Sequence, residues 1–238
     1  MTSIITLRAF SDNHIYLYQY EPDKSIAIDP GDSKPVLKYM EKNNLALTAI
    51  LATHHHSDHI GGAIELKKKT GCKIMGADAK RIAAIDKVVK DHELLGFGNI
   101  NIEVLATPGH TTTSVCYYIP KKEENEGGIL FTGDTLFIGG CGRLFECDAQ
   151  TMWNSLQKLA ALPGDTKVFC GHDYTLENYK FASQIEPENP LLLEQVKKFK
   201  QGKPTLASTI AREKEINIFL KATSAEVFAE LRRLKDEF

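Results

Sequence analysis

The sequence predicts a layered α/β or α+β sandwich followed by a small helical domain. Up to about His172, short strand-like apolar runs alternate with segments of helical apolar spacing. Strands with helices between and outside them are typical of layered folds. Beyond His172 the strand signals fade and helical spacing dominates, which indicates a separate helical region at the C-terminal end.

The expected strands are runs rich in β-branched or aromatic residues that end at turn residues. The third run, for example, closes at the turn signal Pro30-Gly31-Asp32. In order along the chain, the expected strands cover residues 4–10, 15–20, 25–29, 47–52, 73–75, 100–106, 114–119, 129–132 and 167–170.

Helices are expected where apolar residues recur at helical spacing. Asp32 or Ser33 is suited to cap a helix over 33–43, and Gly61 and Gly62 precede one over 63–69. The other expected helices cover 151–162, 191–200 and 225–238, and residues 78–98 are expected to be partly helical and partly loop. We place the boundary between the two domains at residues 174 and 175.

Length and composition are those of an ordinary globular protein. The chain has 238 residues, of which 42% are hydrophobic and 25% charged. No apolar run is long enough for a membrane helix, and the N-terminus has no signal-peptide pattern. The net charge of −2 argues against a general nucleic-acid binder, and the five scattered cysteines, without CxxC pairing, indicate reduced thiols. We therefore expect a cytoplasmic monomer that binds neither nucleic acid nor membranes.

A run of metal-binding side chains follows the expected strand at 47–52. His54, His56, Asp58 and His59 form an H-x-H-x-D-H string. His54 and His56 are two residues apart, so an extended segment places both side chains on one side, whereas His55 points the other way. Asp58 and His59 follow a turn and are suited to a second metal. Four ligands within one loop are more than a single tetrahedral metal requires, which indicates a two-metal site.

Three further candidate ligands each follow a strand-like run and a glycine: His110, Asp134 and His172. The Asp134 carboxylate has two oxygens and can therefore bridge two cations. Imidazole and carboxylate ligands suit zinc, iron(II) or manganese. The sequence shows no Ser/His/Asp or Cys/His relay, so a metal-bound hydroxide is the expected nucleophile.

These motifs resemble the metallo-β-lactamase superfamily, and the whole chain resembles the glyoxalase II (hydroxyacylglutathione hydrolase) family within it. The ligand string and its downstream partners carry the superfamily resemblance, whereas the narrower one rests on other stretches as well. The supporting stretches are residues 11–13, 29–31, 53–62, 107–113, 131–136, the Gly140-Cys141-Gly142-Arg143 run with residues 144–146, residues 171–175 and the basic helical tail at 232–235.

The resemblance implies a four-layer αββα sandwich with a small C-terminal helical domain. It divides the chain into a dimetal domain, 1–174, and a helical substrate-binding domain, 175–238. It implies that one metal is held by His54, His56 and His110, the other by Asp58, His59 and His172, with Asp134 bridging. Asp58 and Asp134 are thereby the expected catalytic carboxylates, acting with the metal-bound hydroxide. Zinc is the expected metal, and iron and manganese are alternatives.

The resemblance also implies where the substrate binds. Glutathione is expected against Arg143, Tyr174, Arg232 and Lys235. Some family members have tyrosine where Phe145 stands, so a hydrogen bond from that side chain is lost here.

The expected reaction is hydrolysis of S-(2-hydroxyacyl)glutathione, with S-D-lactoylglutathione as the first candidate, which would be the second step of methylglyoxal detoxification. A thioester leaves as a thiolate with a pKa near 8.5 and needs little help from a general acid. The alternatives are another activity on the same fold, such as a lactonase or a persulfide dioxygenase, and a non-catalytic metal-binding or redox module.

Overall fold

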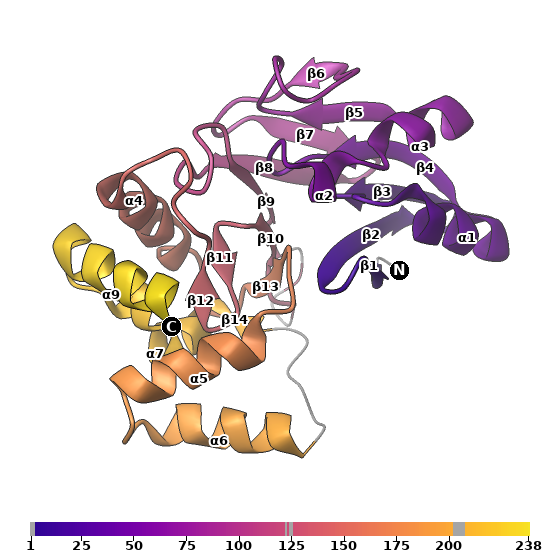
Figure 1. Ribbon diagram of the computed structural model, residues 1–238. Helices are drawn as coiled ribbons and strands as arrows, with labels where there is room; N and C mark the ends of the chain where they lie inside the picture. Colours follow the sequence, from indigo (N-terminus) through magenta and orange to yellow (C-terminus); the bar gives the residue numbers. More distant parts are fainter. Residues whose placement is uncertain (1–2, 122, 124–125, 202–207) are drawn as a thin grey trace. The chain divides into compact units, whose positions relative to one another are not determined.

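The computed structural model describes residues 3–121, 123, 126–201 and 208–238. The chain forms two compact units (Figure 1). Unit 1 comprises Met1–Ala106 and Thr113–Ile119, and unit 2 comprises Thr107–Thr112 and Pro120–Phe238. None of the helices within the described ranges is long and apolar enough to cross a membrane.

Unit 1 is built on a six-stranded mixed sheet with the order β1-β2-β3-β4-β5-β6. The first two pairings are antiparallel, and β3-β4, β4-β5 and β5-β6 are parallel. The strands are β1 (Ser3–Ala9), β2 (Asn13–Glu21), β3 (Lys24–Ile28), β4 (Ala46–Leu51), β5 (Lys73–Gly76) and β6 (Lys87–Val88). Strand β4 ends at Leu51, shortly before the histidine string begins at His54.

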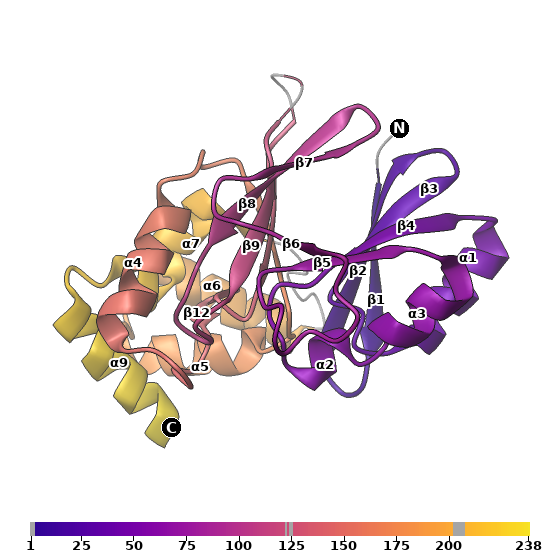
Figure 2. The same cartoon turned by 90° about the horizontal axis from the view of Figure 1, so that it is seen from above.

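Two helices, α1 (Ser33–Asn43) and α3 (Ala63–Thr70), cover one face of this sheet (Figure 2). The Asp32 carboxylate accepts a hydrogen bond from the Lys34 amide and caps α1, as expected. Val36 of α1 and Leu66 of α3 are fully buried against apolar residues of β2 and β4. The short helix α2 (Ser57–Ile60) lies between β4 and α3 in sequence.

Unit 1 also contains an antiparallel meander, β7 (Leu94–Phe97), β8 (Ile100–Ala106) and β9 (Val115–Ile119). The expectation of helix within residues 78–98 was wrong, because this stretch contains only β6 and β7 as regular elements. The structure uses this segment for turns and for two strands at sheet edges.

Unit 2 contains a second set of strands and the helices of the C-terminal half. Strand β10 (Ile129–Gly133) pairs in parallel with β13 (Lys167–Cys170), which pairs antiparallel with β14 (Ser208–Thr209). A short hairpin, β11 (Leu136–Phe137) and β12 (Gly140–Cys141), follows β10. The helices are α4 (Ala149–Ala160), α5 (Thr175–Ile185), α6 (Pro190–Lys200), α7 (Ile210–Ile216), α8 (Ile218–Lys221) and α9 (Ala225–Glu237).

The terminal helix α9 packs beside α4 (Figures 1 and 2). Ser224 caps α9 by accepting from the Val227 amide, and Phe228 is completely buried. The Trp153 indole of α4 donates to the Ala222 carbonyl just before α9. These contacts confirm the helical C-terminal region and fix the face of α9 that carries Arg232 and Lys235.

Candidate metal ligands and a basic pocket

The histidine string begins at the end of β4 and runs into α2. His54 and His59 are almost fully buried, each with 1% of its surface exposed. The Thr53 hydroxyl lies 3.0 Å from His54 Nδ1, and His54 Nε2 lies 3.2 Å from His56 Nδ1. The structure therefore brings the imidazoles of this string together, as their spacing predicts.

Asp29 orients this group from the end of β3. Its carboxylate accepts from the Thr53 amide at 2.7 Å and the Thr53 hydroxyl at 2.6 Å, and it lies 3.0 Å from His59 Nδ1. A carboxylate on one ring nitrogen fixes the tautomer, so that His59 presents Nε2 as the metal-binding atom. Asp29 adopts a left-handed backbone conformation, with φ of 50°, that aspartate tolerates better than most residues.

Asp58 is held by a side chain from β2. The Asn13 amide donates to Asp58 Oδ2 at 2.9 Å, and the same oxygen lies 3.3 Å from His59 Nε2. Gly31 permits this arrangement, because a Cβ there would lie 1.8 Å from the Asp58 carbonyl oxygen. Unit 1 thus presents four candidate ligands around one small volume.

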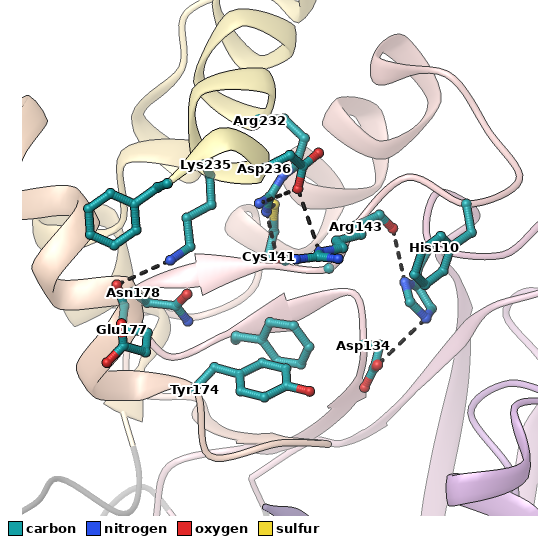
Figure 3. A pocket seen from close by; sticks show the side chains of 14 residues that line it. His110, Asp134, Cys141, Arg143, Tyr174, Glu177, Asn178, Arg232, Lys235 and Asp236 are labelled. Carbon is teal, nitrogen blue, oxygen red and sulfur yellow. Dashed lines mark hydrogen bonds and ion pairs between the residues drawn. The ribbon is translucent and has the colours of Figure 1, made fainter.

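Unit 2 carries the other three candidate ligands. Asp134 Oδ2 lies 3.5 Å from His110 Nε2 and 3.4 Å from His172 Nε2. His110 Nδ1 donates to the Arg143 carbonyl at 2.9 Å, which leaves Nε2 directed at Asp134 (Figure 3). The backbone at Gly142 can lie close to the backbone of Asp134 because glycine has no Cβ, which would lie 1.9 Å from the Asp134 carbonyl oxygen.

The ligand atoms within each unit are spaced as metal ligands are. Zinc–nitrogen bonds of about 2.1 Å in a tetrahedral site place neighbouring ligand atoms about 3.4 Å apart. The separations at Asp134 and at the Asp58–His59 pair are 3.3–3.5 Å, longer than good hydrogen bonds. The residues therefore fit divalent metals by chemistry and by spacing. Cys170, two residues before His172, is not counted among these candidate ligands, because its buried thiol donates to the His172 carbonyl.

A pocket of about 530 Å³ lies within unit 2 beside these ligands. One end is formed by His110 and Asp134, and the other by side chains of α5 and α9 (Figure 3). Its lining residues are His110, Asp134, Phe137, Cys141, Gly142, Arg143, Phe145, Tyr174, Glu177, Asn178, Arg232, Lys235, Asp236 and Phe238. All four substrate-binding candidates from the sequence are among them.

The four candidates differ in how far they are available to a ligand. Tyr174 stacks on His172, with ring centroids 4.8 Å apart, and remains 39% exposed. The Arg143 side chain is 66% exposed. Lys235 donates to the Glu177 carbonyl at 3.2 Å, and burial together with the neighbouring Arg232 lowers its pKa.

Arg232 is the exception, because its side chain is only 6% exposed. Its Nη1 donates to the Cys141 carbonyl at 3.0 Å, and the guanidinium lies 5.0 Å from the centre of the Phe219 ring. It therefore forms part of the pocket wall and ties α9 to the β11–β12 hairpin.

Three residues had no role assigned by sequence reasoning: Asn13, which donates to Asp58, Asp29, which lies beside His59, and Asp236, which accepts from Arg232. The first two lie in stretches that carry the family resemblance, but nothing in their spacing indicates which ligand they hold. Asp236 adjoins Lys235 and appears in the sequence as one more charge on an exposed helix.

Fold and ligands define a member of the metallo-β-lactamase superfamily, and residues 9–172 match that superfamily. Residues 173–238 match the hydroxyacylglutathione hydrolase C-terminus. The chain is 44% identical to the hydroxyacylglutathione hydrolase of Chromohalobacter salexigens over 100% of both chains. It is 43% identical to the Pelagibacter ubique hydroxyacylglutathione hydrolase over 98% of each. The chain belongs to the hydroxyacylglutathione hydrolase family.

Solved structures agree on the fold. The structure of ETHE1 from Myxococcus xanthus matches with a TM-score of 0.75 and 26% identity, covering 97% of this chain and 90% of that one. A metallo-β-lactamase from Staphylococcus aureus matches with a TM-score of 0.71 and 20% identity, covering 99% of this chain and 71% of that one. The predicted sandwich with a C-terminal helical region is confirmed.

Proposed function

We propose that this protein hydrolyses S-(2-hydroxyacyl)glutathione thioesters, with S-D-lactoylglutathione as its principal substrate. The observation that carries the proposal is the pocket of unit 2. It has candidate metal ligands at one end, His110 and Asp134, and the basic side chains Arg143 and Lys235 elsewhere in its wall. A ligand with a reactive carbonyl and remote carboxylates suits such a pocket, and glutathione thioesters have both.

We further propose that seven residues hold two divalent metals. These are His54, His56, Asp58, His59, His110, Asp134 and His172, with Asp134 as the bridging carboxylate. The spacing of the ligand atoms within each unit supports this assignment, as does the orientation of His59 and His110 by partners on their second ring nitrogen. Zinc is the first candidate, and iron and manganese suit the same ligands. When bound, such metals polarise a carbonyl and lower the pKa of a bound water.

The pocket residues orient the substrate. Arg143 and Lys235 attract the carboxylates of glutathione, and Tyr174 offers a partly exposed ring and hydroxyl beside His172. Phe145, 61% exposed and 5.0 Å from the His110 ring, supplies an apolar contact in place of a hydroxyl. Arg232 acts on the substrate mainly by keeping α9 in the pocket wall.

In this proposal residues 1–174 form the metal-binding domain and residues 175–238 the helical substrate-binding domain. Helix α9 supplies Arg232 and Lys235 to the pocket, which supports a substrate-binding role for the C-terminal domain. All five cysteines lie in the described part of the chain and none forms a disulfide, which supports a cytoplasmic protein. We propose that it acts as a monomer.

The test is release of free thiol from S-D-lactoylglutathione by the metal-loaded protein. The proposal predicts rapid thiol release that is lost when metal is removed. A lactone and a glutathione persulfide serve as competing substrates. Turnover of either of them without thioester hydrolysis would assign the chain a different activity on the same fold.

A further inference from the structure

One carboxylate of the pocket wall lies between two guanidinium groups. Asp236, in the last turn of α9, accepts from Arg232 Nη2 at 2.9 Å, and the same oxygen lies 3.6 Å from Arg143 Nε (Figure 3). A helix C-terminus carries partial negative charge and disfavours a carboxylate. The two arginines therefore account for the position of Asp236.

The two arginines depend on Asp236 to different degrees. Arg232 is buried and is also held by the Cys141 carbonyl and the Phe219 ring. Arg143 is two-thirds exposed, and its guanidinium faces the pocket with Asp236 as an ion-pair partner. Removing the charge of Asp236 would thus leave Arg232 in place and change chiefly the availability of Arg143.

We propose that Asp236 is a specificity-determining residue that competes with the substrate carboxylate for Arg143. This inference rests on the proposed function. Glutathione keeps both carboxylates through the reaction, so an interaction with them strengthens substrate and product binding equally. An internal carboxylate at Arg143 weakens both, which lets the anionic product leave and lowers the affinity for unrelated anions.

If Asp236 instead positions Arg143, neutralising Asp236 should change the affinity for anionic ligands in the opposite direction. If Asp236 held Arg143 in its binding orientation, neutralising Asp236 would weaken the binding of anionic ligands. If Asp236 competes, neutralising it strengthens their binding. The side-chain amide of Asp236→Asn still accepts from Arg232, so this variant changes charge with little change in shape.

The experiment compares Asp236→Asn with a matched control, Glu230→Gln. Glu230 is on the same helix, pairs with Arg233 and is not among the pocket-lining residues, so the control makes the same change in net charge outside the pocket. Thermal melting first establishes that both variants fold. Titration calorimetry then gives the dissociation constant of S-methylglutathione, and kinetics gives the KM for S-D-lactoylglutathione and the inhibition constant of glutathione. The D-lactoyl thioester of N-acetylcysteamine, which has no carboxylate, is the uncharged probe.

We expect Asp236→Asn to bind S-methylglutathione about fivefold more tightly at low salt, the order expected from removing one like charge at a partly solvated site. KM and the inhibition constant should fall in parallel, the gain should shrink in high salt, and the uncharged thioester should be unaffected. Unchanged or weaker binding by Asp236→Asn would overturn the inference, as would an equal gain in Glu230→Gln. Wild-type protein that releases no thiol would instead contradict the proposed function itself.

Discussion

Two of the proposed histidine ligands are held by neighbours that leave one ring nitrogen directed at the proposed metals. His59 is held through Nδ1 by Asp29, and His110 through Nδ1 by the Arg143 carbonyl. Asn13 differs, because it donates to Asp58 Oδ2, the same oxygen that lies beside His59 Nε2. The candidate ligands could be selected from the sequence because most of them form one local string. Their supports could not, since a carboxylate 30 residues away in sequence becomes a partner only through the packing of β3 beside β4.

Asp29→Asn tests whether the Asp29 carboxylate supports metal binding by holding His59. Asparagine tolerates the left-handed conformation at this position, so the backbone should be retained, but the charge that orients His59 is lost. We expect metal affinity to fall by about 10- to 100-fold, measured by competition with a chromogenic chelator. Asp23→Asn, at an exposed turn position of the same unit, is the control and should keep wild-type affinity. Equal metal affinity in both variants would show that Asp29 serves the fold alone.

Substitutions at Asp134 and His55 compare a proposed ligand with a histidine of the string that we do not expect to bind metal. Asp134→Ala removes the proposed bridge, and Asp134→Asn keeps its shape without its charge. Both should lose metal content and at least about a hundredfold in turnover. His55, whose Nε2 lies 3.2 Å from Arg81 Nη1, should tolerate alanine with little loss. Metal analysis and kinetics check this, and a His55→Ala variant as damaged as the Asp134 variants would mean that the ligand string is misassigned.

Among the elements, α9 combines a structural role with a proposed binding role on one face. Its helical spacing and its pair of basic residues were visible in the sequence, as were most strands. The short pieces β11, β12 and β14 were not predicted, because two-residue strands have no periodicity to detect. Nor does sequence spacing reveal that Arg232 is buried and Lys235 lines the pocket more openly, since this depends on how α9 packs against Cys141, Phe181 and Phe219.

Single substitutions on α9 should therefore have different effects. Arg232→Ala leaves the buried Cys141 carbonyl without its donor and should lower the free energy of unfolding by about 1–3 kcal/mol. Arg233→Ala removes only exposed ion pairs with Glu230 and Glu237, and should change it by less than about 0.5 kcal/mol. Denaturant unfolding of the two variants measures the difference, and equal stabilities would contradict the structural role of Arg232.

Lys235→Ala should instead act on substrate binding. Because Lys235 lines the pocket away from His110 and Asp134, its interaction should be the same in ground and transition states. We expect KM for the glutathione thioester to rise roughly tenfold, about 1.4 kcal/mol, with kcat and metal content retained. Hydrolysis of a small uncharged thioester is the control and should barely change. A fall in kcat with an unchanged KM would instead show that Lys235 acts in the reaction itself.

At the scale of the whole molecule, the proposed ligands come from segments far apart in the chain. Four lie within residues 54–59, and the others are His110, Asp134 and His172. The fold class could be predicted because ligands after successive strands follow a superfamily pattern, but metal identity could not, since imidazole and carboxylate suit several metals. Bound metals would link these segments, so the free energy of metal binding should contribute to the stability of the fold.

Chelation should therefore lower thermal stability as well as activity. We expect the Tm of the metal-free protein to fall by several degrees and to recover when zinc, iron or manganese is restored. Scanning calorimetry of the same preparation before and after chelation measures this. An unchanged Tm after verified removal of metal would mean that the metals contribute nothing to the fold.

The proposed function requires that metal held by the His/Asp residues drives thioester hydrolysis. The most direct test adds metal stepwise to verified metal-free protein while free thiol release from S-D-lactoylglutathione is followed. We expect negligible release at the start and full turnover once about two metals per chain are bound. Full turnover by the metal-free protein, or none by the fully loaded protein, would contradict it.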